Sequence, residues 1–157
     1  MTHRENTVLL VDDNPMNLQV LFQTLSEIEA RFLIAKNGEL ALDIIAESKP
    51  DLILLDINMP GIDGYEVCRQ VKSNAETKDI TIIFLSALGE IGDKVKGFEL
   101  GAVDYITKPF QSEEVIARVK TQLTLFNLRL QAQEQTHILK HKANVAMEML
   151  RDAKQKQ

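Results

Sequence analysis

Four short hydrophobic runs, each ending on a side chain that can bind phosphate or a metal ion, constrain the fold of this chain more than any other feature. They are residues 9–13 (LLVDD), 52–56 (LILLD), 82–86 (IIFLS) and 105–108 (YITK). If the runs are parallel strands, their carboxyl ends lie along one edge of a sheet, where open α/β folds bind their ligands. Three carboxylates, a hydroxyl and an ammonium group would then share one crevice.

The carboxylates expected at that edge repel one another. Two unit charges about 4 Å apart interact by ~1 kcal/mol in water and by ~4 kcal/mol near a protein surface. Asp12, Asp13 and Asp56 would therefore raise one another's pKa values unless a cation lay among them. Oxygen ligands of this kind favour a hard divalent ion, Mg²⁺ above all, with Mn²⁺ as a substitute. The sequence therefore predicts a divalent-metal site.

The length of the chain bounds the number of domains. A chain of 157 residues with 45% hydrophobic residues suits one globular domain and an appendage, but not a second full domain. The longest apolar stretch falls short of the ~20 residues of a membrane span, and the polar start is unlike a signal peptide. We therefore expect a soluble, cytoplasmic protein with no membrane insertion.

The charge is distributed unevenly along the chain. Residues 1–125 contain 12 Lys and Arg against 20 Asp and Glu, for a net charge of −8, whereas residues 126–157 contain 6 against 3, for +3. An acidic globule thus carries a mildly basic tail. An acidic surface disfavours contact with phosphate backbones, so no direct binding of nucleic acid is expected.

Strand and helix patterns alternate along the first 125 residues. Continuous apolar runs predict buried strands at 7–11, 31–35, 51–56, 80–85 and 103–106, and helical spacing of apolar residues predicts a helix after each. Asn14-Pro15 marks the start of the first helix and Asn37-Gly38 a turn. This alternation predicts an α/β fold with a doubly wound parallel sheet, and we expect the flavodoxin-like (βα)5 arrangement with strand order 2-1-3-4-5.

The last part of the chain predicts one long helix. From Ser112 onward the sequence lacks Pro and Gly, and Ser112-Glu113-Glu114 is typical of a helix start. A seam at alternating steps of three and four residues includes two polar positions among its nine members, which predicts a weak coiled coil: Leu125, Leu128, Ala132, Gln135, Leu139, Lys142, Ala146, Met149 and Ala153. We expect a globular domain over residues 1–125 and a helical extension over residues 126–157. The extension would serve as a coiled-coil linker, a docking helix or a dimerisation helix.

The motifs at the strand ends point together to one family. They are residues 11–14 (VDDN), 55–64 (LDINMPGIDG), 85–87 (LSA) and 104–110 (DYITKPF), and they occur in this order. Over roughly residues 6–125, the chain resembles the receiver domain of two-component response regulators, which work in histidine-to-aspartate phosphorelays.

The resemblance implies a role for each residue of the crevice. Asp56 would be the phosphoacceptor, attacking the phosphorus of a donor phosphohistidine or of a small phosphodonor. Asp13 would ligate Mg²⁺ directly and Asp12 largely through water, and Asp56 and the backbone carbonyl of Asn58 would complete the protein ligands. Lys108 would supply positive charge around the transferring oxygens.

The resemblance also implies a conformational switch. The Ser86 hydroxyl would turn toward the new phosphoryl group, Tyr105 would follow it inward, and the Lys108-Pro109 peptide would be cis. The partners would be a histidine kinase or a histidine phosphotransfer protein, and a homodimer could form through helix 4, strand 5 and helix 5 and through the C-terminal helix. The domain would take part in its own phosphorylation and dephosphorylation without being an enzyme that turns over an external substrate.

Two alternative functions use a similar strand edge. A phosphohydrolase of the haloacid dehalogenase type also has an aspartyl nucleophile and Mg²⁺, but it needs a general-acid Asp two residues later, where this chain has Asn58. A flavin or nucleotide carrier would need a glycine-rich phosphate loop after the first strand, where Asp12-Asp13 would repel phosphate. Both alternatives are disfavoured by these residues.

Overall fold

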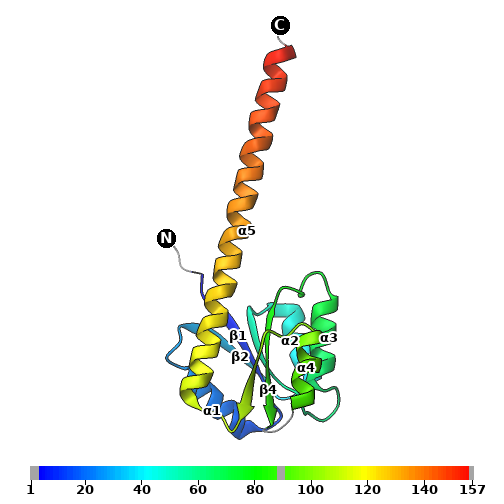
Figure 1. Cartoon of the computed structure of the whole chain (residues 1–157), viewed down its shortest axis with the longest axis vertical. Helices are drawn as coiled ribbons and strands as arrows, with labels where there is room; N and C mark the ends of the chain where they lie inside the picture. Colours follow the sequence, from blue (N-terminus) through cyan, green and yellow to red (C-terminus); the bar gives the residue numbers. More distant parts are fainter. Residues whose placement is uncertain (1–3, 88–90, 156–157) are drawn as a thin grey trace. The chain divides into compact units, whose positions relative to one another are not determined.

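Five strands and five helices alternate in the computed structural model, which describes residues 4–87 and 91–155 and, for residues 91–94, the backbone alone (Figure 1). The strands are β1 (Asn6–Val11), β2 (Ala30–Ala35), β3 (Leu52–Asp56), β4 (Thr81–Ala87) and β5 (Asp104–Lys108). The helices are α1 (Pro15–Leu25), α2 (Gly38–Ser48), α3 (Gly64–Ser73), α4 (Ile91–Glu99) and α5 (Ser112–Gln155). Every predicted element is present, and the bounds differ from the prediction by a few residues.

The sheet is parallel throughout and has the order β2-β1-β3-β4-β5. The flavodoxin-like fold predicted from the sequence is therefore confirmed. Because β1 and β3 are neighbours, the residues that follow β1 lie beside the end of β3. Asp56 pairs with Leu85 on β4, and Ser86 pairs with Thr107 on β5, so the four predicted strand-end motifs meet at one edge.

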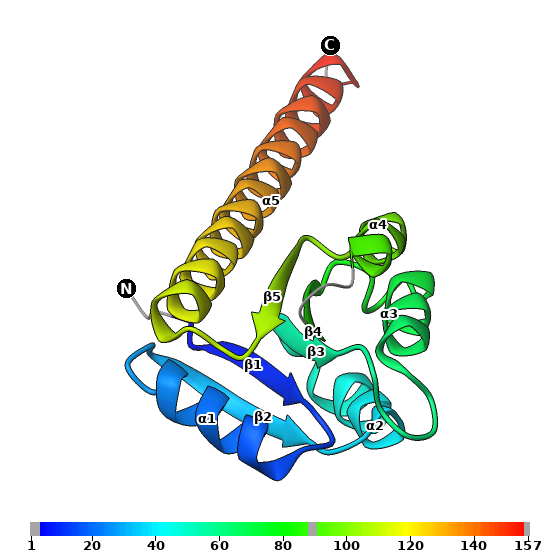
Figure 2. The same cartoon turned by 60° about the horizontal axis from the view of Figure 1, so that its bottom comes forward.

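Helices cover both faces of the sheet (Figure 2), and a hydrophobic core lies on each face. On one face α1 and the first turns of α5 cover the strands with residues such as Leu21 and Val119. On the other face α2 and α3 contribute residues such as Ile45 and Val67. The central strand β3 is buried along its whole length, as a strand covered on both faces must be.

Side chains at the helix starts explain where the helices begin. Asn14 caps α1 by accepting hydrogen bonds from the backbone N–H groups of Met16 and Asn17, and Pro15 occupies the first helical position. The predicted turn at Asn37-Gly38 is instead a second cap: Asn37 accepts from the N–H of Leu40, and Gly38 is the first residue of α2. Asn is favoured both in turns and at N-caps, so the sequence pattern left the two structures unresolved.

The chain divides into two compact units, residues Met1–Leu123 and Thr124–Gln157. The helix α5 runs through 44 residues and contributes to both units, as the stretch without Pro and Gly predicted. The predicted domains of 1–125 and 126–157 stay a prediction. Across the residues that the structure describes, no helix combines the length and the hydropathy needed to cross a membrane.

A buried carboxylate, that of Asp51, lies at the amino end of β3, away from the strand-end motifs. Asp51 is 2% exposed and accepts hydrogen bonds from the Arg4 guanidinium at 2.7 and 3.0 Å, from the Asn6 amide at 3.1 Å and from the Thr7 backbone N–H at 2.9 Å. These contacts join the start of β1 to the residue before β3, and so support the alignment of the two strands that carry the carboxylates.

We expect Asp51→Ala to lower the free energy of unfolding by roughly 2–4 kcal/mol, because it removes the acceptor of a buried amide and of a backbone N–H group. Arg4→Ala is the matched control: its removal should cost less than Asp51→Ala, because the Asn6 amide and the Thr7 N–H still donate to the Asp51 carboxylate. Urea unfolding of both variants measures the difference. Equal losses would contradict a role for Asp51 beyond the ion pair.

Candidate functional site

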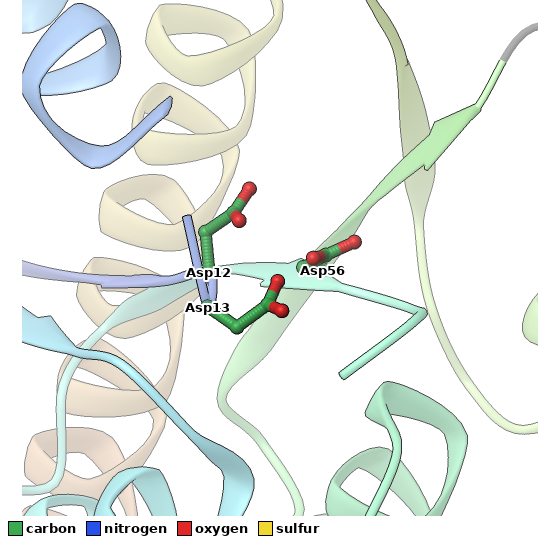
Figure 3. A group of neighbouring side chains, drawn as sticks. All are labelled: Asp12, Asp13 and Asp56. Atoms are coloured by element: carbon green, nitrogen blue, oxygen red, sulfur yellow. The ribbon is translucent and has the colours of Figure 1, made fainter. Parts of the chain in front are cut away.

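Three carboxyl groups meet where β1 and β3 end (Figure 3). Asp12 and Asp13 directly follow β1, and Asp56 is the last residue of β3. One oxygen of each lies within 4.8 Å of those of the other two, while Asp12 and Asp56 are buried and Asp13 is exposed. The structure thus brings together the three acidic residues that the sequence placed at one edge.

Lys108, at the end of β5, lies between the two buried carboxylates. Its Nζ atom is 3.0 Å from Asp56 Oδ1 and 3.2 Å from Asp12 Oδ2. Burial lowers the pKa of Lys108, but the hydrogen bonds and charges of Asp56 and Asp12 more than offset this and hold the pKa above its ordinary value. The ammonium group therefore stays charged, and the Lys108-Pro109 peptide bond that follows is cis, as expected.

Two asparagines hold Asp12 in place. The backbone N–H of Asn14 donates to Asp12 Oδ1 at 2.9 Å, and the Asn17 amide donates to Asp12 Oδ2 at 3.2 Å. Asn17 was not among the residues predicted from the sequence. The predicted helix start at Pro15 brings Asn17 near Asp12 in the first turn, but the contact itself depends on the rotational position of α1.

The negative charge of the Asp56 carboxylate is only partly neutralised by the groups around it. Burial, followed by the neighbouring charge of Asp12, raises the pKa of Asp56 to about 6, although Lys108 and the backbone N–H of Asn58 act in the opposite direction. Its Oδ2 atom is buried and accepts no hydrogen bond from any residue within 4–87 or 91–155. An unsatisfied carboxylate oxygen in a buried site is ready to accept a cation or to react.

Ser86 lies on β4, the neighbour of the strand that carries Asp56, and Tyr105 lies on β5, the next strand of the sheet. The Ser86 side chain is 1% exposed, and its Oγ atom has no hydrogen-bond partner in the part of the chain that the structure describes. Tyr105 is buried as well, with its ring centroid 5.6 Å from that of Phe84 and 5.1 Å from that of Phe98. A Cβ atom at Gly97 would overlap the Tyr105 hydroxyl, so glycine on α4 makes room for the inward tyrosine.

Close backbone packing completes the site after β3. The N–H of Gly64 donates to the carbonyl of Ile57 at 2.8 Å, and a Cβ atom at position 64 would overlap the carbonyl oxygen of Asp56. The backbone N–H of Asn58 lies 3.4 Å from Asp56 Oδ1. The loop between Asp56 and α3 is therefore held against the strand end, which places Asn58 beside the carboxylates.

The donor set fits a hard divalent cation. Carboxylate oxygens are the ligands that Mg²⁺ prefers, and Mg²⁺ is usually held by one or two carboxylates together with phosphate and water. Here the exposed Asp13 leaves room for water, and the buried Asp56 carries an oxygen without a partner among the described residues. The residues present thus fit the metal that the sequence predicts.

The family model of the response regulator receiver domain matches residues 8–120, which is most of the chain. This chain belongs to that family. The match includes most of β1, the other four strands and the residues of the crevice, from Asp12 to Lys108. The resemblance inferred from the strand-end motifs is therefore confirmed.

Relatives of this receiver domain have diverse names. The phosphate regulon transcriptional regulatory protein PhoB of Pseudomonas aeruginosa is 44% identical over 117 residues, which are 74% of this chain and 51% of PhoB. A probable cyclic di-GMP phosphodiesterase of Vibrio cholerae is also 44% identical over 117 residues, but these are only 26% of that protein. The chain spans about half the length of most curated relatives that it matches, so the likeness concerns their receiver domains.

A solved structure shows the same architecture. The crystal structure of a putative response regulator from Chloroflexus aurantiacus aligns with a TM-score of 0.74 and 39% identity, covering 77% of this chain and 99% of that one. The aligned share is close in extent to the unit Met1–Leu123. The roles of Asp56, Lys108, Ser86 and Tyr105 stay predictions, although the structure places the first three at one edge of the sheet and Tyr105 farther back on β5.

We expect Asp56→Asn to raise the free energy of unfolding of the metal-free protein at pH 7 by roughly 1–3 kcal/mol. The pKa of Asp56 in the folded state is about 6, above its unfolded value of 3.8, so the folded protein binds the extra proton in this range. Its contribution to stability is therefore present at about pH 4 and is lost as the pH rises through about 6. Asn resembles the protonated carboxyl group but does not titrate, so the variant keeps this contribution to stability as the pH rises.

Urea unfolding in a chelator, from about pH 4 to about pH 7, measures this gain. The difference between Asp56→Asn and the wild type should grow with pH and level off above the pKa of Asp56. Asp43→Asn, on the exposed face of α2, is the control and should show no such growth. A difference that stays constant with pH would show that Asp56 titrates normally.

Proposed function

We propose that this receiver domain is a signalling switch that accepts a phosphoryl group on Asp56 in a metal-dependent reaction. The observation that carries the proposal is the arrangement around Asp56: Lys108 at 3.0 Å from Oδ1, and a buried Oδ2 without a partner among the described residues. One oxygen is thus held by a fixed cation, and the other is available for attack. The two neighbouring aspartates provide the means to hold a metal next to the attacked phosphorus.

The transfer forms one bond and breaks one bond. Asp56 Oδ2 attacks the phosphorus of a phosphohistidine, the P–N bond breaks, and the imidazole leaves with the electron pair and takes up a proton. With acetyl phosphate the P–O bond to acetate breaks instead. Because Asp56 must be ionised to attack, the burial and the Asp12 charge that raise its pKa have to be offset when the donor arrives.

The residues that would hold the metal are Asp12, Asp13, Asp56 and the backbone carbonyl of Asn58. When bound, Mg²⁺, or Mn²⁺ in its place, supplies the positive charge that neutralises these carboxylates and the phosphoryl oxygens. Lys108 adds a second positive charge, 3.0 Å from Asp56 Oδ1. Phosphoryl transfer depends mainly on alignment and charge, so these residues supply what the reaction needs.

The signal leaves the site through Ser86 and Tyr105. The unsatisfied Ser86 hydroxyl can donate to a phosphoryl oxygen on Asp56, because Ser86 follows Leu85, the residue paired with Asp56. A shift of Ser86 would favour the inward Tyr105, which already packs between Phe84 and Phe98. If the inactive state is favoured by ~2 kcal/mol, the phosphoryl group must favour the active state by more than this.

The partners follow from this chemistry. The phosphoryl donor is a histidine kinase or a histidine phosphotransfer protein, and the surface formed by α4, β5 and α5 is proposed to change its partner on phosphorylation, with a second copy as one such partner. The domain takes part in its own phosphorylation and turns over no external substrate. A phosphohydrolase is less well supported, because the position two residues after Asp56 is occupied by Asn58, which cannot act as a titrating acid.

We expect Asp56→Asn to abolish covalent phosphorylation while the fold is kept. Intact-protein mass spectrometry after incubation with acetyl phosphate and Mg²⁺ should show one added phosphoryl group on the wild type and none on the variant. Asp43→Asn, exposed on α2, should be labelled like the wild type. Labelling of Asp56→Asn that persists would refute the assignment of the acceptor.

We expect Lys108→Ala to retain Mg²⁺ affinity but to lose most of the conformational response to phosphorylation. The ammonium group can contact a phosphoryl group on Asp56 from its present position, whereas the proposed metal ligands are other residues. Backbone amide NMR spectra with and without beryllofluoride, which mimics the phosphoryl group, measure the response. A variant that responds like the wild type would contradict the role of Lys108.

A further inference from the structure

Leucines in the second unit repeat every eleven residues. Leu128, Leu139 and Leu150 lie on α5, and their side chains are 55%, 65% and 64% exposed. Large apolar side chains exposed at a regular spacing mark a surface that contacts another molecule. The coiled-coil seam predicted from the sequence, in contrast, includes the charged side chain of Lys142.

The eleven-residue repeat gives an almost straight stripe along the helix. At about 100° per residue, eleven residues turn through about 1,100°, which is about 20° more than three full turns. Helical geometry places four alanines and one more leucine within about 40° of the mean direction of the three leucines: Leu125, Ala132, Ala143, Ala146 and Ala153. Gln135 is the polar member, and Lys142 lies at the border of the stripe.

Basic residues border this Leu/Ala stripe on one side. Each leucine of the repeat is followed by a base, namely Arg129, Lys140 and Arg151, and Lys154 lies on the same side of the helix. The acidic residues between 124 and 155 are Glu134, Glu148 and Asp152, and helical geometry places all three on the face opposite the stripe. The stripe therefore has a basic border and no acidic one.

This charge pattern disfavours a second copy of the chain as the occupant. In an antiparallel pair, the basic border of one helix would face the same border of the other, and like charges would repel. In a parallel pair, that border would face the other side of the stripe, which offers Ile138, Met149 and Lys142 and no acid. Neither arrangement brings a base against a carboxylate, as paired coiled coils do at their flanks.

We propose that the stripe binds an amphipathic helix of a different protein, one whose apolar stripe is bordered by Asp and Glu. Such a partner would complement Lys140, Arg151 and Lys154 and bury the exposed leucines. The alternation of Leu and Ala suits a facing helix, because the alanines leave holes for the partner's side chains. A lipid surface is a poorer match, because membrane-binding faces are rich in bulky and aromatic residues and this stripe contains none of the latter.

A pair of synthetic peptides tests the charge of the partner against the full chain. The acidic peptide has the sequence of residues 124–155 with Glu in place of Lys140, Arg151 and Lys154, and the control peptide has the unchanged sequence. We expect the acidic peptide to bind the chain roughly tenfold or more tightly than the control, and to weaken as salt rises. Fluorescence anisotropy of the labelled peptides measures both.

Two variants of the chain test the stripe itself. Leu139→Asp should abolish binding of the acidic peptide, whereas Leu130→Asp, on the opposite face of α5, should leave it within about twofold. Both leucines are exposed, so circular dichroism should show an unchanged fold. Equal or tighter binding of the unchanged peptide would make a second copy the occupant and overturn the proposal. The proposal would also be overturned if the chain bound vesicles containing phosphatidylserine through Leu139 and did not bind the peptide. Binding of the acidic peptide that Leu139→Asp leaves intact would overturn it as well.

Discussion

Two buried carboxylates that share one lysine are the interaction on which the site depends. Asp12 and Asp56 are almost fully buried, and Lys108 contacts both. Burial raises the pKa of Asp56 to about 6, together with the charge of Asp12, because one ammonium group cannot neutralise two carboxylates. The sheet order maintains this unfavourable arrangement, because β1 and β3 are neighbours and the lysine is the last residue of β5, at the same edge. A divalent cation with a phosphoryl group would resolve the imbalance.

The main features of fold and site followed from the residues at the ends of the hydrophobic runs. Parallel strands place their carboxyl ends at one edge, so the runs that end in Asp12, Asp56, Ser86 and Lys108 were sufficient to predict which groups meet. The order of the strands was expected from the alternation of strand and helix patterns, and the structure confirms it. Periodicity also located each helix to within a few residues.

Features that depend on exact side-chain direction could not be predicted. Asn17 contacts Asp12 because α1 begins in one particular rotational position, and Gly97 makes room for Tyr105 because α4 packs closely on β5. Likewise, Asn37 could form a turn or a cap, and only tertiary packing decides between them. In the tail, heptad and eleven-residue spacings both fit part of the sequence, and they differ in whether Lys142 contacts a partner.

The site depends on an Asp56 carboxylate whose ionised form is disfavoured, by burial and by the charge of Asp12, until a cation binds beside it. The most direct test is the pKa of Asp56, measured by carbon-13 NMR of its carboxyl group with and without Mg²⁺. The account predicts a pKa of about 6 in the metal-free protein and a decrease to below about 4 in saturating Mg²⁺. A pKa that is ordinary without metal, or one that Mg²⁺ leaves unchanged, would contradict it.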